Sequence, residues 1–229
     1  MGVRSGDASV RRLAWDALVS AYWRPVYKYL RLQWRADAEQ ARDWTQEFFA
    51  RALEKAFFDR FDPAKAHFRT FLRVCVDGMV GKEKEAERRL KRGGGVAPLS
   101  LDFATAEGEL DHAEPPAPGS LDDYFRAEWI RGLFAQALAD LEKECDESGK
   151  RRQFELFHRC DLEAPDRRER PSYAELAQEF SLPVTQVTNW LHATRSRLRG
   201  CVLARLRDSC ASDDEFRAEA KALFGATPG

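Results

Sequence analysis

The sequence predicts an all-α protein with two helical domains joined by a flexible linker. Three observations support this fold class: apolar side chains recur at helical spacing over long stretches, Ala, Arg, Leu and Glu are abundant, and a Gly- and Pro-rich segment interrupts the pattern. The chain has 229 residues, of which 44% are hydrophobic, so one or two packed cores are expected.

The first domain is expected over residues 1–92 as a succession of helices. Apolar residues at helical spacing run from Trp15 to Leu30, then around Phe48, and a third pattern begins at Phe68. Pro25 should kink or divide the first helix, because its ring removes one backbone hydrogen bond. The third helix ends in a highly charged, basic tail over residues 82–92.

Residues 93–120 are expected to be a linker. Three glycines begin it, an acidic stretch follows, and a Pro-rich run over 115–119 closes it. This composition cannot bury enough apolar area to order itself. Two roles stay open: a tether, or a negatively charged strand that occupies a basic nucleic-acid channel as a mimic.

The net charge of −1 conceals an alternation along the chain. Residues 1–98 carry +7, residues 99–147 carry −10, and residues 148–229 carry +2. A neutral total therefore does not exclude a nucleic-acid partner, because the basic segments are separated from the acidic one.

The second domain is expected over residues 121–210, followed by a helical extension over residues 211–229. A helix around Trp129 precedes a shorter one around Phe157, and two capping boxes, Ser172–Glu175 and Ser212–Glu215, mark later helix starts. The final helix is expected from Asp213 to Phe224, either packing back on the protein or making a regulatory contact.

Residues 173–191 have the layout of a helix-turn-helix, with a turn at 181–183. On a helical wheel Val187, Leu191, Thr194 and Leu198 fall within about 60° of one another and form the core side. The opposite side, expected to face the DNA major groove, consists of Thr185, Asn189, His192, Ala193 and Ser196. Trp190 is interpreted as half-buried packing.

Residues 181–207 contain no carboxylate and five arginines. Such a stretch suits phosphate contacts, whose free energy comes largely from counterion release. The alternative is a solvated basic helix at the end of an ordinary bundle. Gln186 and Asn189 have side chains that can pair bidentately with adenine, whereas the arginines fix position.

Several classes of protein are disfavoured by the residues. The five cysteines are scattered and never form a C-x-x-C pair, and the four histidines lack metal-ligand spacing, so we expect reduced thiols, no metal and no cofactor. No local motif suggests a catalytic set, and we expect no enzymatic activity. Without a signal peptide or a membrane-length apolar run, a cytoplasmic protein that does not bind membranes is expected.

Four motifs together resemble a known family. They are Q-A-R-D-W-T-Q-E-F-F-A-R-A-L over 40–53, F-R-T-F-L over 68–72, K-R-G-G-G-V-A-P-L-S-L-D over 91–102, and the helix-turn-helix. In this order they resemble an extracytoplasmic-function sigma factor of bacterial RNA polymerase over nearly the whole chain. The resemblance implies a sigma region 2 bundle at 1–92 and a sigma region 4 helix-turn-helix at 121–210.

The resemblance also implies residue roles. Contacts with core RNA polymerase are expected from Asp43, Gln46, Glu47 and Arg51. Contacts with the −10 promoter element and its melted non-template strand are expected from Arg60, Phe61, Lys65, His67, Arg69 and Arg73. Contacts with the double-stranded −35 element are expected from Thr185, Gln186, Thr188, Asn189, His192, Ala193, Arg195, Ser196, Arg197 and Arg199. The basic tail over 82–92 would help to follow the melting strand.

The chain departs from the family pattern at the polymerase-docking helix and at the start of the third helix. Residues 40–43 read Gln-Ala-Arg-Asp where the family has Asp-Ala-Glu-Asp, so two acids are missing. Phe71-Leu72 replaces a Trp-Leu pair, and Gly78 stands in place of Asn. We hypothesise that phosphorylation of Thr45 supplies the missing charge, as in a subgroup linked to Ser/Thr kinases. The alternative is that Thr45 belongs to the apolar face of its helix.

The function expected from the sequence is therefore that of an alternative sigma factor directing transcription initiation. Two alternatives are a helix-turn-helix regulator acting without polymerase and a kinase-linked adaptor that has lost promoter activity. A Ser/Thr kinase or an anti-sigma protein would be a further partner.

Overall fold

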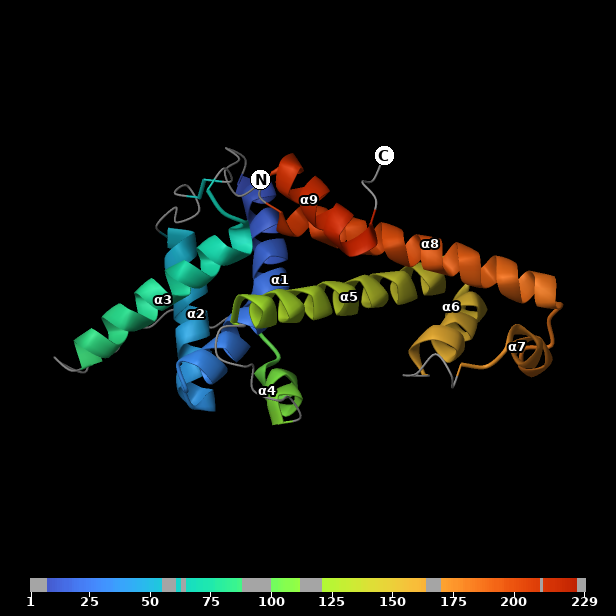
Figure 1. The fold of residues 1–229 in the computed structure, drawn as a ribbon, viewed down its shortest axis with the longest axis horizontal. Helices are drawn as coiled ribbons and strands as arrows, with labels where there is room; N and C mark the ends of the chain where they lie inside the picture. Colours follow the sequence, from blue (N-terminus) through green and yellow to red (C-terminus); the bar gives the residue numbers. More distant parts are fainter. Residues whose placement is uncertain are drawn as a thin grey trace. The chain divides into compact units, whose positions relative to one another are not determined.

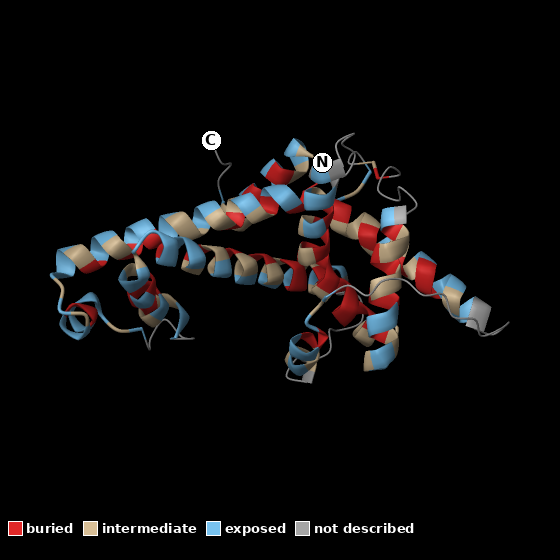
Figure 2. Ribbon diagram, turned by 180° about the vertical axis from the view of Figure 1, so that it is seen from behind, coloured by how far each residue is buried: buried red, intermediate tan, exposed pale blue. Residues whose placement is uncertain are grey.

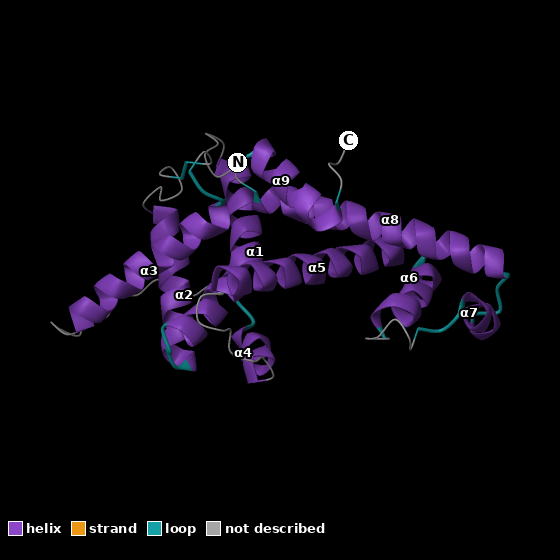
Figure 3. Ribbon diagram, viewed as in Figure 1, coloured by secondary structure: helices purple, strands orange, loops and turns teal. Residues whose placement is uncertain are grey.

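The computed structural model describes residues 8–54, 61–62, 65–87, 100–111, 121–163, 170–210 and 212–225. This part of the chain consists of helices and loops without a strand (Figures 1 and 3), which confirms the all-α prediction. The helices are α1 (Ala8–Gln33), α2 (Ala38–Glu54), α3 (Phe68–Glu87), α4 (Phe103–Asp111), α5 (Leu121–Glu147), α6 (Arg151–Phe157) with the π-helical turn η3 (His158–Leu162), α7 (Tyr173–Glu179), α8 (Val184–Ser209) and α9 (Asp213–Phe224). None of the described helices has the length and apolar character needed to cross a membrane.

The contacts divide the chain into two compact units. Unit 1 consists of residues 1–132 and 206–229, and unit 2 of residues 133–205. The division falls inside α5 and α8, so each of these helices contributes one part to each unit. These units differ from the boundaries expected from the sequence, which placed all of 121–210 in one domain.

Helix α1 runs through the core of unit 1. Leu18, Tyr22, Val26 and Leu30 are at most 2% exposed, and Figure 2 shows buried residues along much of the helix. Pro25 does not divide the helix as expected, since α1 continues to Gln33. Burial of the surrounding apolar side chains compensates for the one backbone hydrogen bond that proline removes.

The first turns of α5 belong to unit 1 because two of their aromatic residues pack on α1. Trp129 stacks on Tyr22 with ring centroids 6.2 Å apart and an interplanar angle of 12°. Phe125 meets Tyr29 edge-on at 6.0 Å. Both α5 side chains are at most 2% exposed. Aromatic burial of this kind is a large favourable contribution, and it explains why the boundary does not follow the linker.

Part of the predicted linker is ordered, which corrects the expectation for residues 103–111. Here the chain forms α4, in which Phe103 and Ala106 are buried. The Phe103 ring lies 5.3 Å from that of Trp23 and 5.1 Å from that of Tyr27, measured between centroids. Composition alone missed this helix, because the apolar surface that orders it belongs to α1. The remaining linker residues, 93–99 and 112–120, lie outside the described part.

Two acidic residues of α4 are paired with cations of α1. Glu109 accepts hydrogen bonds from Lys28 at 2.6 Å and from Arg24 at 2.8 Å. Glu107 binds the guanidinium of Arg31 and accepts a 2.5 Å hydrogen bond from the Tyr27 hydroxyl. Two of the acids counted in the acidic segment are thus paired inside unit 1, which argues against Glu107 and Glu109 acting as a nucleic-acid mimic.

Acid should loosen α4 from α1. The hydrogen bonds from Arg31 to Glu107, reinforced by that from Tyr27, lower the pKa of Glu107. A carboxylate whose pKa is lowered by folding stabilises the protein above its unfolded-state pKa of about 4.3, and this stability is lost as the pH falls. We expect Glu107→Gln to lower the melting temperature at pH 7 and to flatten its decline below pH 5.

Thermal denaturation as a function of pH would measure this effect, with the exposed Glu39→Gln as a matched control. Parallel curves for the wild type and Glu107→Gln would show that the Glu107 pairs contribute no net stability.

Candidate nucleic-acid interface

A helix, a turn and a second helix follow one another in unit 2, as the sequence predicts for residues 173–191. Helix α7 begins with a complete capping box: the Ser172 hydroxyl accepts from the Glu175 N–H at 3.2 Å, and Glu175 accepts from the Ser172 N–H at 2.7 Å. Ser181 has a positive φ of 52°, which turns the chain between α7 and α8. The Leu182 N–H donates to the Ala177 carbonyl at 2.9 Å and ties the turn to α7.

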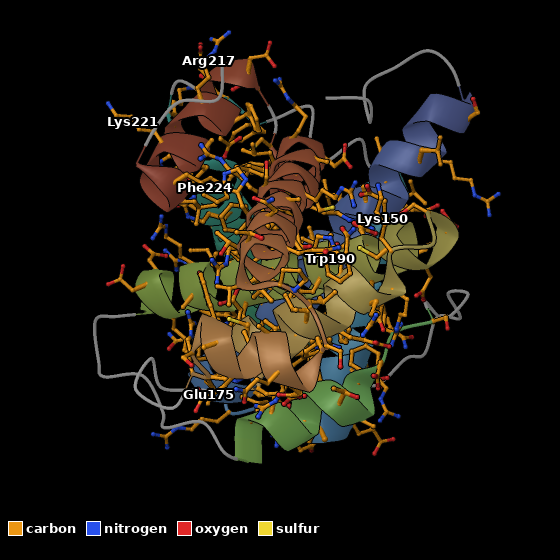
Figure 4. The ribbon with its side chains drawn as sticks, turned by 90° about the vertical axis from the view of Figure 1, so that its right-hand side faces the viewer. Lys150, Glu175, Trp190, Arg217, Lys221 and Phe224 are labelled. Carbon is orange, nitrogen blue, oxygen red and sulfur yellow. The ribbon has the colours of Figure 1, made fainter. Side chains whose placement is uncertain are left out.

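This helix pair is held by a continuous apolar core. Its buried members come from α5, α6, η3, α7 and α8, and Trp190 packs partly buried against them. They are Leu141, Cys145, Phe154, Leu156, Phe157, Cys160, Leu176, Ala177, Val187 and Leu191. Figure 4 labels Trp190 on α8 and Glu175 on α7. The expected role of Trp190 as a packing residue is confirmed.

The core side and the solvent side of α8 are those predicted from the helical wheel. Val187, Leu191 and Thr194 are buried, and Leu198 is half-buried. The five residues expected on the groove-facing side are all exposed: Thr185, Asn189, His192, Ala193 and Ser196. Gln186 is half-buried, and the exposed Thr188 donates its hydroxyl to the Val184 carbonyl at 3.0 Å. Asn189 is thus the exposed amide on this face.

Acids from other elements neutralise several arginines of α8, which corrects the reading of this stretch as free positive charge. Arg195 donates to both oxygens of Asp161 at 2.7 and 2.9 Å and to the Tyr173 hydroxyl at 3.2 Å. Arg197 lies 3.7 Å from Glu144. Arg205 and Arg207 pair with Asp140 and Asp213. The sequence conceals these pairs because every acid lies outside residues 181–207.

Arg195 is nevertheless placed where it can contact a phosphate. Its side chain is 41% exposed, and Asp161 and Tyr173 fix the direction of its guanidinium. The Asp161 hydrogen bonds raise the pKa of Arg195 above its already high value, so the group stays charged. Asp161 and Tyr173 are thus positioning residues that the sequence reasoning missed. No spacing signal links them to Arg195, since they come from η3 and α7.

In unit 1, the residues expected to contact the −10 element do not form an open surface. Arg60 lies outside the described residues. Phe61 is 6% exposed and packs edge-on against Phe68 with ring centroids 5.1 Å apart. It is therefore a core residue here, which corrects its assignment as a base contact. Lys65 is exposed and lies 3.2 Å from Asp62.

The basic side chains around the start of α3 contact acids. His67 and Arg69 both contact Glu219 of α9, the histidine at 3.3 Å. Arg73 lies 2.5 Å from Asp122 and 3.2 Å from Asp77. His67 and Arg69 thus lie together around a carboxylate that the prediction did not include.

An open cavity of about 570 Å³ lies beside this cluster. Residues from the segment before α3 and from α9 line it: Lys65, Ala66, His67, Ser212, Asp214, Glu215 and Ala218. One feature of the sequence does indicate a buried, paired role for Glu219. Glu219 shares a helical face with Phe216, Ala220 and Leu223, and an acid on an apolar face needs a partner when that face packs.

The residues of α2 that are expected to bind polymerase differ in their exposure to solvent. Asp43 is exposed, and Gln46 and Glu47 are half-buried. Arg51 lies 2.5 Å from Glu47 and 2.6 Å from Glu83 of α3. The guanidinium of Arg42, which stands where the family has an acid, lies 5.5 Å above the Phe103 ring of α4. This cation therefore has a packing role inside unit 1.

Thr45 has the surroundings of a core residue. Its side chain is 0% exposed, and its hydroxyl donates to the Ala41 carbonyl at 2.7 Å. A kinase could reach this hydroxyl only after α2 separates from its neighbours. The structure therefore favours the packing interpretation of Thr45 over its use as a phosphorylation site.

Comparison with known proteins gives no family for the chain: no protein-family model, curated protein or solved structure matches it.

Proposed function

We propose that the protein is an alternative sigma factor that binds core RNA polymerase and directs it to promoters with characteristic −10 and −35 elements. The observation that supports DNA reading is the single row of exposed side chains on α8, with Asn189 at its centre and a packed core behind it. An α-helix with this arrangement fits the major groove, where an amide can pair bidentately with adenine.

The polymerase-dependent part of the proposal rests on the sequence resemblance. The four motifs occur in the order found in the family, and α2 exposes Asp43 at the position that implies polymerase contact. Melting a promoter requires unstacking of base pairs, at a cost of a few kcal/mol per step. A small protein in which many of the described cations are paired with acids needs polymerase to supply the rest of the DNA channel.

Transcription from a candidate promoter with purified core polymerase tests the proposal. Initiation that requires both core polymerase and this protein supports it. Sequence-specific DNA binding without polymerase-dependent initiation would instead favour a helix-turn-helix regulator, and neither activity would favour an adaptor.

Asn189 and Arg199 should have different roles at the −35 element. We expect Asn189→Ala to cost about 1–3 kcal/mol at one base position and to relax preference there, whereas Arg199→Ala should weaken binding to all sequences and reduce its salt dependence. Binding to DNA fragments carrying single-base variants of the −35 element, measured at two salt concentrations, would separate the two effects. If both substitutions lower affinity uniformly, the assignment of Asn189 as a base reader is wrong.

A further inference from the structure

Glu219 of α9 is an almost buried carboxylate in contact with two arginines and a histidine. Its side chain is 4% exposed and contacts Arg69 of α3, the ring of His67 at 3.3 Å and Arg126 of α5 at 3.7 Å. All four residues belong to unit 1. Two arginines and a histidine that converge on one point form a site for negative charge, because guanidinium groups bind carboxylate and phosphate oxygens in the same way.

A second carboxylate of α9 occupies the N-terminus of α3. Glu215 accepts a 2.6 Å hydrogen bond from the N–H of Phe68, the first residue of this 20-residue helix. Free N–H groups and the helix dipole make a helix N-terminus favourable for anions. Glu215 and Glu219 stand four residues apart and therefore lie on one face of α9. Together they place two negative charges on the cationic cluster and on the helix end beside it.

The carboxylate of Glu219 is not fully hydrogen-bonded at this site. Among the described residues, Oε2 of Glu219 has no hydrogen-bond partner, although it is buried and only 3.7 Å from Arg126. Burying a charge without all of its hydrogen bonds is costly, so such a pair contributes little net stability. Helix α9 is also the last described helix and ends at Gly225, which has a positive φ of 70°. Its displacement would interrupt no other described helix, although it would expose the buried Phe216 and Ala220.

The site lies where the proposed function requires contact with DNA. His67 and Arg69 are the residues that the resemblance implies for the −10 element, and the cavity of about 570 Å³ beside them has Lys65 in its wall. A cavity of this size is large enough for a small polar ligand. Arg217 and Lys221 of α9 are exposed and point outward (Figure 4), whereas Glu219 of the same helix is buried.

We propose that α9 is an intramolecular acidic ligand, whose Glu215 and Glu219 occupy an anion site that takes backbone phosphates of single-stranded DNA once α9 is displaced. This inference rests on the proposed function, since it concerns how contact with the melted strand is regulated. In the free chain α9 competes with DNA. Displacement of α9, by polymerase or by DNA itself, exposes Arg69, Arg126 and the start of α3.

The test measures binding of the full-length protein to a fluorescently labelled single-stranded oligonucleotide without polymerase. We expect Glu219→Gln to raise the affinity by roughly fivefold or more, which is the lower range of coupling between sites. The matched control is Asp213→Asn, which removes the same charge from the same helix but contacts Arg207 instead of the site. Adding Arg69→Gln to Glu219→Gln should abolish the gain, and circular dichroism should show folded variants.

The outcomes separate the two proposals. Equal affinities for wild type, Glu219→Gln and Asp213→Asn would overturn the role of α9, even if polymerase-dependent transcription occurs. An equal gain in Glu219→Gln and Asp213→Asn would also overturn it, since net charge would then explain the effect. A gain confined to Glu219→Gln, without polymerase-dependent initiation by any variant, would support masking of the site by α9 and refute the sigma function.

Discussion

Replacing Thr45 with glutamate is expected to disrupt the packing of α2 in unit 1 and destabilise the protein instead of activating it. Thr45 is 0% exposed, and the neighbouring Phe48 and Phe49 are at most 2% exposed. Phe49 also meets Trp15 of α1 with ring centroids 6.1 Å apart. Even a neutral polar group without partners costs roughly 2–7 kcal/mol to bury, so we expect Thr45→Glu to lower the free energy of unfolding by about 3 kcal/mol or more.

Urea denaturation followed by circular dichroism would measure this loss. Two controls isolate its cause. Thr45→Val keeps the shape and removes only the hydroxyl that donates to Ala41, so its cost should be about 1 kcal/mol. Leu53→Glu introduces the same charge on α2 at a side chain that is 58% exposed, and it should be close to neutral.

The same three variants decide the phosphorylation hypothesis. Wild-type stability of Thr45→Glu, together with stronger binding to core polymerase in a pull-down, would mean that α2 opens readily and that phosphorylation can supply the missing charge. A destabilised Thr45→Glu and a polymerase-binding Thr45→Val would leave Thr45 as a packing residue. The arginine at position 42, where the family has an acid, would then be explained by its contact with Phe103, without a phosphate on Thr45.

Replacement of Lys28 by methionine should cause a similarly large loss. The Lys28 side chain is 1% exposed, and its ammonium lies 2.5 Å from Glu128 and 2.6 Å from Glu109. Without the lysine, the Glu128 carboxylate stays 3% exposed and retains Arg131, whose own side chain is 62% exposed. Removing one partner of a buried ion pair costs roughly 3–5 kcal/mol, because the other charge is left uncompensated.

For a chain of this size, such a loss corresponds to a fall in melting temperature of roughly 10 °C. The double variant Lys28→Met/Glu128→Leu should recover much of it, since an apolar pair avoids the uncompensated charge. Lys65→Met, at a side chain 82% exposed, is the surface control and should change little. A double variant no more stable than Lys28→Met would show that packing, and not charge, explains the loss.

Ion pairs connect several acids of the middle and end of the chain to cations of its basic beginning. Glu107 and Glu109 of α4 and Glu128 of α5 bind cations of α1, and Glu219 of α9 binds Arg69 of α3. The segments of opposite charge are therefore bound to each other inside unit 1. The net charge of −1 is set by composition, and folding places many of these opposite charges beside one another.

Features that depend on neighbours along the chain could be predicted from the sequence. The capping box at Ser172, the core side of α8 and its exposed row around Asn189 follow from spacings of three or four residues, which a helix converts into faces. Of the capping box predicted at 212–215, the structure gives the Ser212 half: its hydroxyl accepts from the Glu215 N–H at 3.2 Å, and the Glu215 carboxylate accepts from the Phe68 N–H.

Which charges are free was decided only by the tertiary structure. Arg195 and Arg69 look alike in the sequence as cations near DNA-binding motifs, yet Asp161 binds one and Glu219 the other, from 34 and 150 residues away. Likewise, α4 forms in a linker-like segment because Trp23 and Tyr27 cover Phe103. Local spacing determines helices and their faces. Burial and ion pairing depend on segments that meet only when the chain folds, since desolvation and Coulomb energies follow distance in space.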